Sequence, residues 1–167
     1  MKTLIIHPKD ESTDFLSVIY EGMTNSEVLR SNPQCFGIKK DIKKADRIIM
    51  LGHGTESGLL GFNRYIINSE HVQLLKNKKC IFIWCNAKDF TTKYNLDGFA
   101  TGMIISEIEE AHHFYINTNC DEIKLSNEMF ANALRKAINN VDIETIILEN
   151  YKGSNQLYEF NIKNIKQ

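Results

Sequence analysis

The stretch Arg47–Gly54, RIIMLGHG, decides the predicted fold of this chain. Four of its first five residues are apolar, and a glycine, a histidine and a second glycine follow at once. A short, continuous apolar run that ends in glycine is typical of a strand buried on both faces of a parallel sheet. Two further runs, TLIIH at Thr3–His7 and CIFIW at Cys80–Trp84, have the same character and are also predicted strands.

Amphipathic segments alternate with these runs, and their spacing predicts helices. Residues 35–45 are predicted helical, a further helix is expected through Tyr115, and the clearest helix begins near Ser126. Thr13 and Ser69 are candidate N-caps of two others, the second running to Leu75, because a hydroxyl accepts a hydrogen bond from the first turn. The inward residues are Phe15, Val18, Ile19 and Met23 after Thr13; Phe36, Ile38 and Ile42; and Met129, Phe130, Ala133, Leu134, Ala137 and Ile138.

Four more segments complete the predicted order of elements. A hairpin is expected in GLLGFNRYII at Gly58–Ile67, strands in ATGMIIS at Ala100–Ser106 and TIILE at Thr145–Glu149, and an edge strand in LYEFNI at Leu157–Ile162. Buried strands that alternate with amphipathic helices favour a parallel sheet covered on both faces. We therefore predict an α/β fold, a three-layer α/β/α sandwich with a mostly parallel sheet, formed by residues 1–167 as one domain.

The composition argues against several classes of protein. Hydrophobic residues make up 43% and charged residues 25%, which is ordinary for a globular domain. The net charge of −1 gives no support to broad binding of nucleic acid or of an anionic membrane. No apolar run reaches the roughly 18 residues of a transmembrane helix, and the first residues lack the apolar core of a signal peptide. Four cysteines without C-x-x-C spacing favour a reducing, cytoplasmic location.

Chemically active side chains follow three predicted strands at their carboxyl ends: His7, His53 and Cys85. Ligand sites of open α/β sheets lie beyond these ends, so parallel neighbouring strands would bring the three side chains to one edge. A thiolate nucleophile needs a proton-transfer partner, and acyl transfer needs backbone N–H donors for the oxyanion. Gly54 lets the backbone approach a reacting carbonyl. Cys80, inside an apolar run, is instead assigned to the core.

The paired blocks Ile48–Gly54 and Ile81–Cys85 resemble those of the caspase–haemoglobinase (clan CD) cysteine peptidases. The resemblance implies a caspase-like fold in which His53 is the catalytic histidine, Cys85 the nucleophile and the N–H of Gly54 the oxyanion donor. It implies a cysteine endopeptidase with a peptide or protein substrate and no metal or organic cofactor. An activator or a homo-oligomer is the other kind of partner that it allows, and neither nucleic acid nor membrane is expected.

A second interpretation comes from another class of protein. It is a catalytically inactive caspase-like or flavodoxin-like binding module, whose cleft holds a ligand or partner without turnover. Trp84 favours this interpretation because it precedes Cys85, where the peptidases usually have a small or polar residue. The small size of the chain and the lack of a recognisable specificity pocket favour it too. Stoichiometric labelling by an acyl or chloromethyl ketone electrophile would separate the two interpretations.

Other motifs are incomplete. The glycines after the RIIML strand approach the dinucleotide fingerprint G-x-G-x-x-G, but Ser57 occupies the third glycine position and a hairpin follows instead of a helix. A cysteine phosphatase would need an arginine six residues after Cys85, where Thr91 stands. Glu109 and His112 put two types of metal ligand on one helix face, but di-iron bundles need that motif twice, so a solvated face is the better interpretation.

Overall fold

The computed structural model describes residues 1–31 and 35–166, without the side chains of residues 35 and 36. Its contacts group the chain into two units, and each unit is described by itself. The first unit comprises Met1–Glu11 and Gly22–Gly102, and the second comprises Ser12–Glu21 and Met103–Gln167. None of the described helices is both long enough and apolar enough to cross a membrane.

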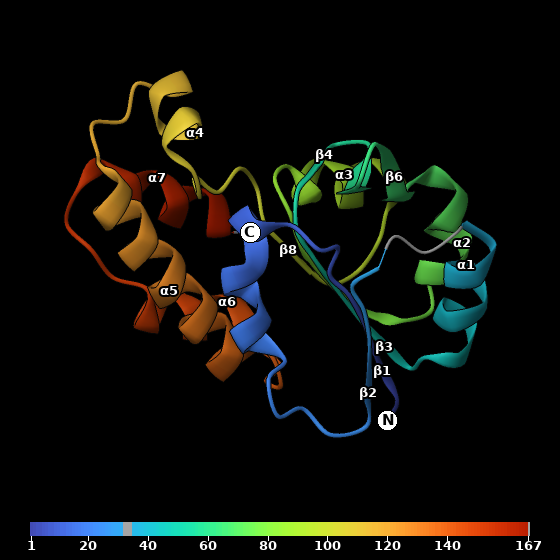
Figure 1. Ribbon diagram of the computed structural model, residues 1–167. Helices are drawn as coiled ribbons and strands as arrows, with labels where there is room; N and C mark the ends of the chain where they lie inside the picture. The colour runs from blue at the N-terminus through green and yellow to red at the C-terminus, as the bar shows by residue number, and fades with distance from the viewer. Residues whose placement is uncertain (32–34, 167) are drawn as a thin grey trace. The chain divides into compact units, whose positions relative to one another are not determined.

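The apolar runs form the central sheet of the first unit (Figure 1). Both faces of this sheet are buried, since Ile48 and Ile49 point to opposite faces and are both 0% exposed. The predicted α/β class, with a parallel sheet as in a three-layer sandwich, is therefore confirmed. The strands are β1 (Thr3–Ile6), β2 (Ser26–Leu29), β3 (Arg47–Leu51), β7 (Lys79–Ile83) and β8 (Phe99–Ala100), all parallel in the order β2-β1-β3-β7-β8.

Helices of the first unit follow its strands along the chain. Ile38 and Ile42 of α1 are buried in the same core as strand residues Met50 and Phe82, as the spacing predicted, while the side chain of Phe36 lies outside the described residues. The expected cap Ser69 is wrong by one position, because the preceding Asn68 accepts from the backbone N–H of Glu70 at 3.0 Å. The helices are α1 (Cys35–Lys44), η2 (Ser69–His71), α2 (Val72–Leu75) and α3 (Ala87–Tyr94).

A small antiparallel sheet lies between β3 and β7 in the chain, as the hairpin prediction expected. It consists of β4 (Gly54–Thr55), β5 (Gly58–Gly61) and β6 (Arg64–Ile67) in sequence order. The indole N–H of Trp84 donates to the carbonyl of Thr55 at 3.0 Å, and the Thr55 hydroxyl lies 2.8 Å from that of Tyr65. These bonds fix the hairpin to the end of β7.

The second unit is helical, and two of its helices were predicted as strands. The TIILE segment lies in α6 and the LYEFNI segment in α7. Side chains cap both helices: Asp142 accepts from the N–H of Thr145 at 3.2 Å, and Asn155 from that of Tyr158 at 3.3 Å. These caps outweigh the strand propensity of the apolar residues that follow them. The helices are α4 (Ile108–His113), α5 (Cys120–Ala137), α6 (Ile143–Asn150) and α7 (Gln156–Ile165).

The helix predicted from Thr13 is a 3₁₀-helix, η1 (Glu11–Ile19), and Thr13 is buried inside it rather than at its cap. Its buried residues are Thr13, Leu16 and Ile19, which recur every third residue. That spacing matches the three residues per turn of a 3₁₀-helix and not the α-helical stripe that the sequence suggested. Phe15 and Val18, assigned to that stripe, are only half-buried.

The two edge strands of the sheet differ from what the sequence predicted. The edge strand β2 was missed because its residues, SEVL, are mostly half-buried and carry no apolar run. The predicted strand Ala100–Ser106 enters the sheet only at Phe99–Ala100. Residues 103–106 are instead held by α7: Asn161 accepts from the N–H of Ile105 at 2.8 Å and donates to its carbonyl at 3.2 Å.

Candidate functional site

The strand order creates a switch point at the carboxyl edge of the first unit's sheet. β2 lies on one side of β1, whereas β3 and then β7 lie on the other, so the chain leaves β1 and β3 in opposite directions. Ligands of open parallel sheets bind in the crevice beyond such a point. The predicted parallel pairing of β3 with β7 is confirmed, with Leu51 opposite Ile83.

His53 follows β3 at this edge and lies near a carboxylate from the loop after β1. Its Nε2 is 3.9 Å from Oδ1 of Asp10, and the two side chains are 28% and 49% exposed. The carbonyl of His53 accepts from the N–H of Leu60 at 2.8 Å, which fixes the histidine's backbone to β5. The imidazole is therefore held beside Asp10 and remains partly accessible to a ligand.

Cys85 follows β7 at the same edge. Because Leu51 pairs with Ile83, His53 and Cys85 each lie two residues beyond a paired position. The Cys85 side chain is half-buried. Cys80, by contrast, is a core residue as predicted: burial raises the pKa of its thiol to about 12, and its Sγ donates to the carbonyl of Leu75 at 3.8 Å. Cys85 is thus the thiol of β7 that a ligand at this edge can reach.

Gly54 was predicted as the oxyanion donor, and the structure gives it a packing role. A Cβ at this position would clash with the indole of Trp84 and with the carbonyl of Gly58. Trp84 is 2% exposed, so the indole has no room to move aside. The glycine is required because β4 crosses directly over the tryptophan.

Two backbone amides of the loop after β1, those of His7 and Lys9, are already engaged. The N–H of His7 donates to the carbonyl of Leu29 at 3.0 Å, and the N–H of Lys9 to that of Arg30 at 2.9 Å. Pro8, between them, has no N–H to offer. The imidazole of His7 is also 0% exposed, so it does not line the accessible edge that the sequence suggested.

The backbone N–H groups at the start of α3 also donate to backbone carbonyls. The N–H of Asn86 donates to the carbonyl of Gly102 at 3.2 Å, that of Ala87 to Trp84 at 3.2 Å, and that of Lys88 to Thr101 at 2.9 Å. Phosphate sites at helix N-termini need such amides to point at the ligand. The amides of His7, Lys9 and residues 86–88 therefore do not form that cradle.

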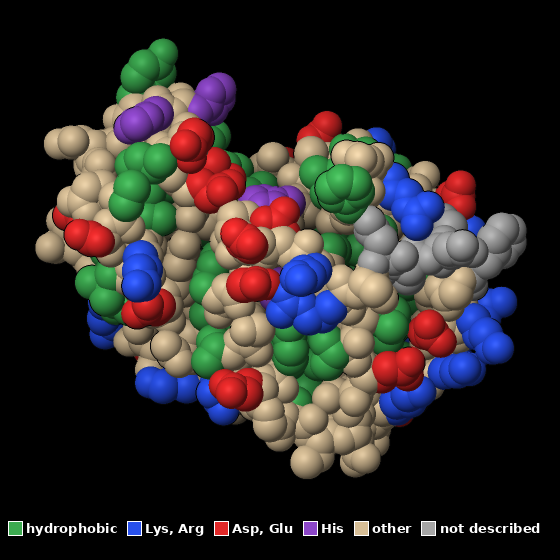
Figure 2. Space-filling model, in the orientation of Figure 1, with side chains coloured by type: hydrophobic (Ala, Val, Ile, Leu, Met, Phe, Trp, Pro, Cys, Tyr) green, Lys and Arg blue, Asp and Glu red, His purple; other side chains and the backbone are tan. Residues whose placement is uncertain are grey.

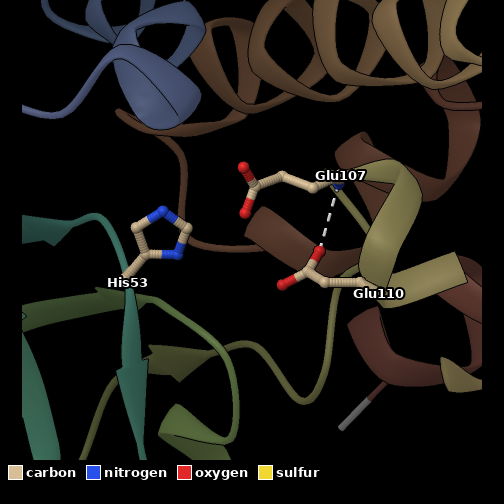
Figure 3. Close-up of side chains that lie close together, drawn as sticks. All are labelled: His53, Glu107 and Glu110. Carbon is tan, nitrogen blue, oxygen red and sulfur yellow. Dashed lines mark hydrogen bonds between the residues drawn. The ribbon is translucent and has the colours of Figure 1, made fainter.

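Two glutamates of the second unit, Glu107 and Glu110, interact at the start of α4. Glu110 accepts through Oε2 from the N–H of Glu107 at 3.2 Å and from that of Ser106 at 2.8 Å, which completes a capping box at the start of α4 (Figure 3). Figure 3 also labels His53, which belongs to the first unit. Glu109 and His112, the pair considered as metal ligands, both lie exposed on α4.

Taken together, the strand order β2-β1-β3-β7-β8 is that of flavodoxin-like sheets, with a candidate site at the β1/β3 switch point. No protein-family model matches the sequence, and no curated protein matches it. A solved structure, an NADPH-quinone reductase from P. pentosaceus, matches over 78% of this chain and 98% of its own, with 13% identity and a TM-score of 0.39. A likeness at this level carries no functional argument.

The assignment to the caspase–haemoglobinase peptidases is wrong. The sequence matches no peptidase family, and the structural match is to a reductase. The implied cysteine endopeptidase, with its His53–Cys85 dyad and hydrolase activity, is withdrawn. The two blocks that suggested it mark where neighbouring strands end, and any parallel sheet with polar residues after its strands produces such a pattern.

Sequence reasoning missed Asp10, whose Oδ1 lies 3.9 Å from Nε2 of His53. It lies four residues after the end of β1, whereas the search considered only the first residues beyond each strand. A search of four positions beyond each strand would have found it. Trp84 was noticed only as a departure from the peptidases, although it anchors the hairpin beside the site.

Proposed function

We propose that the first unit is a flavodoxin-like binding module that holds a small ligand at the β1/β3 switch point. The observation that carries the proposal is the 3.9 Å approach of His53 Nε2 to Asp10 Oδ1, from loops that follow neighbouring strands. Cys85, on the other side of His53 along the sheet edge, is proposed as a further contact. The module binds without turnover.

The chemistry of the edge favours a ligand that side chains recognise. The amides of His7 and Lys9 after β1, and of residues 86–88 at the start of α3, are paired with backbone carbonyls, so these five amides do not serve a phosphate. Asp10 and Glu11 outnumber Lys9 in this exposed loop, and the remaining negative charge repels a phosphate and attracts a cation. The ligand class that fits is a small molecule with an amine or another hydrogen-bond donor directed at Asp10.

The reductase neighbour raises an oxidoreductase as a second candidate. Flavodoxin-like sheets hold FMN at this switch point, and the neighbour's title names NADPH. Both molecules carry phosphates, and the engaged amides of His7 and Lys9 do not fit them. No redox step is therefore derived for this chain.

Trp84 provides the test, because it is the one tryptophan of the sequence and lies at the end of β7. Its fluorescence is titrated with putrescine, inorganic phosphate, FMN and NADPH. We expect saturable quenching by putrescine that Asp10→Asn weakens at least about tenfold, since one charge-assisted hydrogen bond is lost. Asp97→Asn, at the amino end of β8, is the matched control and leaves binding unchanged. Saturable binding of FMN or NADPH that Asp10→Asn leaves intact or strengthens would overturn the proposal.

A cytoplasmic location is a further part of the proposal. It is supported by the cysteines that the structure describes in full, Cys80, Cys85 and Cys120, none of which forms a disulfide. Quantitative alkylation of the protein isolated without reductant tests it. Recovery of a disulfide-linked species would contradict a reducing compartment.

A further inference from the structure

The two units carry opposite net charges. The first unit has 14 lysine and arginine residues against 9 aspartate and glutamate residues, whereas the second has 6 against 12. With neutral histidines the first unit is therefore at +5 and the second at −6, and the total of −1 conceals this separation. A net charge argues about association only when its distribution is known.

The positive charge of the first unit is concentrated in one cluster. Lysines gather on α1 and on the turn between α2 and β7, and Figure 2 shows basic side chains over α1. The ammonium of Lys78 donates to the carbonyl of Lys43 at 3.2 Å, which brings the turn to the end of α1. We call the group the lysine cluster: Lys39, Lys40, Lys43, Lys44, Lys76, Lys78 and Lys79.

Few acids neutralise this cluster among the described residues. Glu70 lies 2.9 Å from Lys39, and Asp41 lies 3.8 Å from Lys44. Lys40, Lys43 and Lys79 are exposed. The cluster contains no arginine, and the large apolar side chains that the structure shows as exposed all lie outside it. Lysine provides point charges and no bidentate or stacking contact, so the cluster acts through electrostatic attraction of an acidic surface.

The second unit carries a matching acidic segment, residues 103–123. It contains five carboxylates and neither lysine nor arginine, and it covers α4 and the first turn of α5. Figure 2 shows acidic, histidine and apolar side chains together over α4. The carboxylates are Glu107, Glu109, Glu110, Asp121 and Glu122.

Two aromatic side chains are exposed within the acidic segment. Tyr115 is 93% exposed and has a φ of +56°, a left-handed conformation that is unusual for a bulky residue. Phe114, beside it, is 37% exposed and packs one face on Phe160 at 4.9 Å between ring centroids. The positive φ of Tyr115 ends α4, because the N–H of Tyr115 donates to the carbonyl of His112 at 3.1 Å and that of Ile116 to the carbonyl of Ala111 at 2.9 Å. The exposed ring is a separate feature, since an aromatic residue flanked by charge is typical of an interface.

We propose that the lysine cluster of one copy binds the acidic segment of a second copy. A separate polyanion would be attracted by one unit and repelled by the other, whereas a second copy offers each unit the opposite charge. Because the two surfaces differ, the contact is heterologous and adds copies head to tail. The proposal does not depend on the ligand site at the switch point.

Sedimentation velocity of the full chain tests the proposal. At about 20 mM salt we expect reversible, concentration-dependent association that falls at least about tenfold in affinity by about 300 mM, where screening is strong. Lys43→Glu with Lys44→Glu should abolish it at low salt. Lys152→Glu with Lys163→Glu makes the same change in net charge on the second unit, and association should persist.

A mixing experiment identifies the partner surface. Glu109→Lys with Asp121→Lys should also remain monomeric alone, while a mixture with the Lys43→Glu, Lys44→Glu protein should form a heterodimer, because one basic cluster and one acidic segment remain. Tyr115→Gly should weaken association severalfold while raising thermal stability, since glycine relieves the positive φ. Circular dichroism checks the fold of each variant.

Two results would overturn the proposal. One is a wild-type chain that stays monomeric at low salt, or associates equally with Lys43→Glu and Lys44→Glu in place. The other is binding of a labelled DNA duplex or an anionic vesicle that those two substitutions abolish while the wild type remains monomeric. The second result would assign the lysine cluster to a polyanion.

Discussion

The two units differ in the hydrogen-bond partners of the N–H and C=O groups in their loops. In the first unit, loop amides donate to backbone carbonyls, as His7 does to Leu29 and Asn86 to Gly102. In the second unit, the segment after β8 depends on side chains: Asn161 binds both backbone groups of Ile105, and Asn164 accepts from the N–H of Met103 at 3.3 Å. The loops after β1 and β7 are thus held by backbone pairing, whereas residues 103–105 are held by the amide side chains of α7.

The buried amide of Asn161 belongs to a longer network. It also donates to the hydroxyl of Tyr151 at 3.0 Å, and that hydroxyl lies 2.6 Å from Oγ of Ser126. Burial raises the pKa of Tyr151, while its hydrogen bonds to Ser126 and Asn161 act in the opposite direction. A network of this kind joins α5, α6 and α7, so single polar substitutions should damage the second unit more than the first.

Asn161→Leu should have the largest effect on stability, and it tests whether the second unit depends on this buried amide. It leaves the N–H and the carbonyl of Ile105 without their partner in a buried site, where each such loss costs about 1–3 kcal/mol. We expect the free energy of unfolding to fall by about 3 kcal/mol in urea titrations. Asn132→Ala removes an exposed bond of the same type, to Glu128, and should change stability little. Equal effects would show that burial does not matter here.

Gly54→Ala tests the packing of the first unit. The added methyl meets the buried indole of Trp84, so we expect a loss of about 2 kcal/mol and a shift in tryptophan fluorescence. Gly37→Ala is the control: it lies on α1 with nothing within 4 Å of the new Cβ and should stabilise the helix by up to about 1 kcal/mol. A Gly54→Ala protein of unchanged stability would mean that β4 is not held against the tryptophan.

His71 makes the first unit sensitive to acid. Its side chain is 0% exposed, its Nδ1 engages Asn68 at 3.1 Å, and its Nε2 has no hydrogen-bond partner among the described residues. Burial, and then the charge of Lys39, lower the pKa of His71 below 6.5. The unfolded chain therefore binds the proton more tightly than the folded chain does. The contribution of neutral His71 to the free energy of unfolding is complete above pH 6.5 and is lost as the pH falls below that value.

The measurement is the free energy of unfolding between pH 7.5 and 5, values that bracket the reference pKa of about 6.5. One group contributes at most about 1.4 kcal/mol per pH unit. His71→Gln should flatten the profile, whereas His112→Gln, on the exposed face of α4, should leave it unchanged. A profile that keeps its slope in His71→Gln would assign the acid sensitivity elsewhere.

Asp142→Ala should have the smallest effect on stability, and it tests the N-cap of α6 in the second unit. It removes the side chain that accepts from the N–H of Thr145 at the start of α6, which costs about 1 kcal/mol. Asp142→Asn keeps the acceptor and should recover most of the loss in thermal unfolding. Failure of asparagine to rescue would point to the charge rather than the cap.

The sequence predicted the central strands of the first unit correctly and two helices of the second unit wrongly. The segments 48–51 and 80–84 are continuous apolar runs, and a strand in a covered parallel sheet buries side chains on both of its faces, so their fold could be predicted. TIILE is also short and mostly apolar, and LYEFNI alternates as an edge strand does, but the state of both depends on caps that lie outside the two segments. The site was partly predictable: the strand ends identified His53 and Cys85, whereas Asp10 required the geometry of the loop.

The sequence by itself determined the α/β class, the strand state of β3 and β7 and the core position of Cys80, because hydrophobic pattern and strand length are local properties. Only the tertiary structure decided that Gly54 packs on Trp84, that the loop amides are engaged, and that a net charge of −1 divides into +5 and −6. Those facts depend on which residues meet across long separations in the chain. Residue types and spacing do not show such long-range contacts, and for that reason they suggested a peptidase. The hydrogen-bonded loop amides and the side chains at the switch point favour a binding module instead.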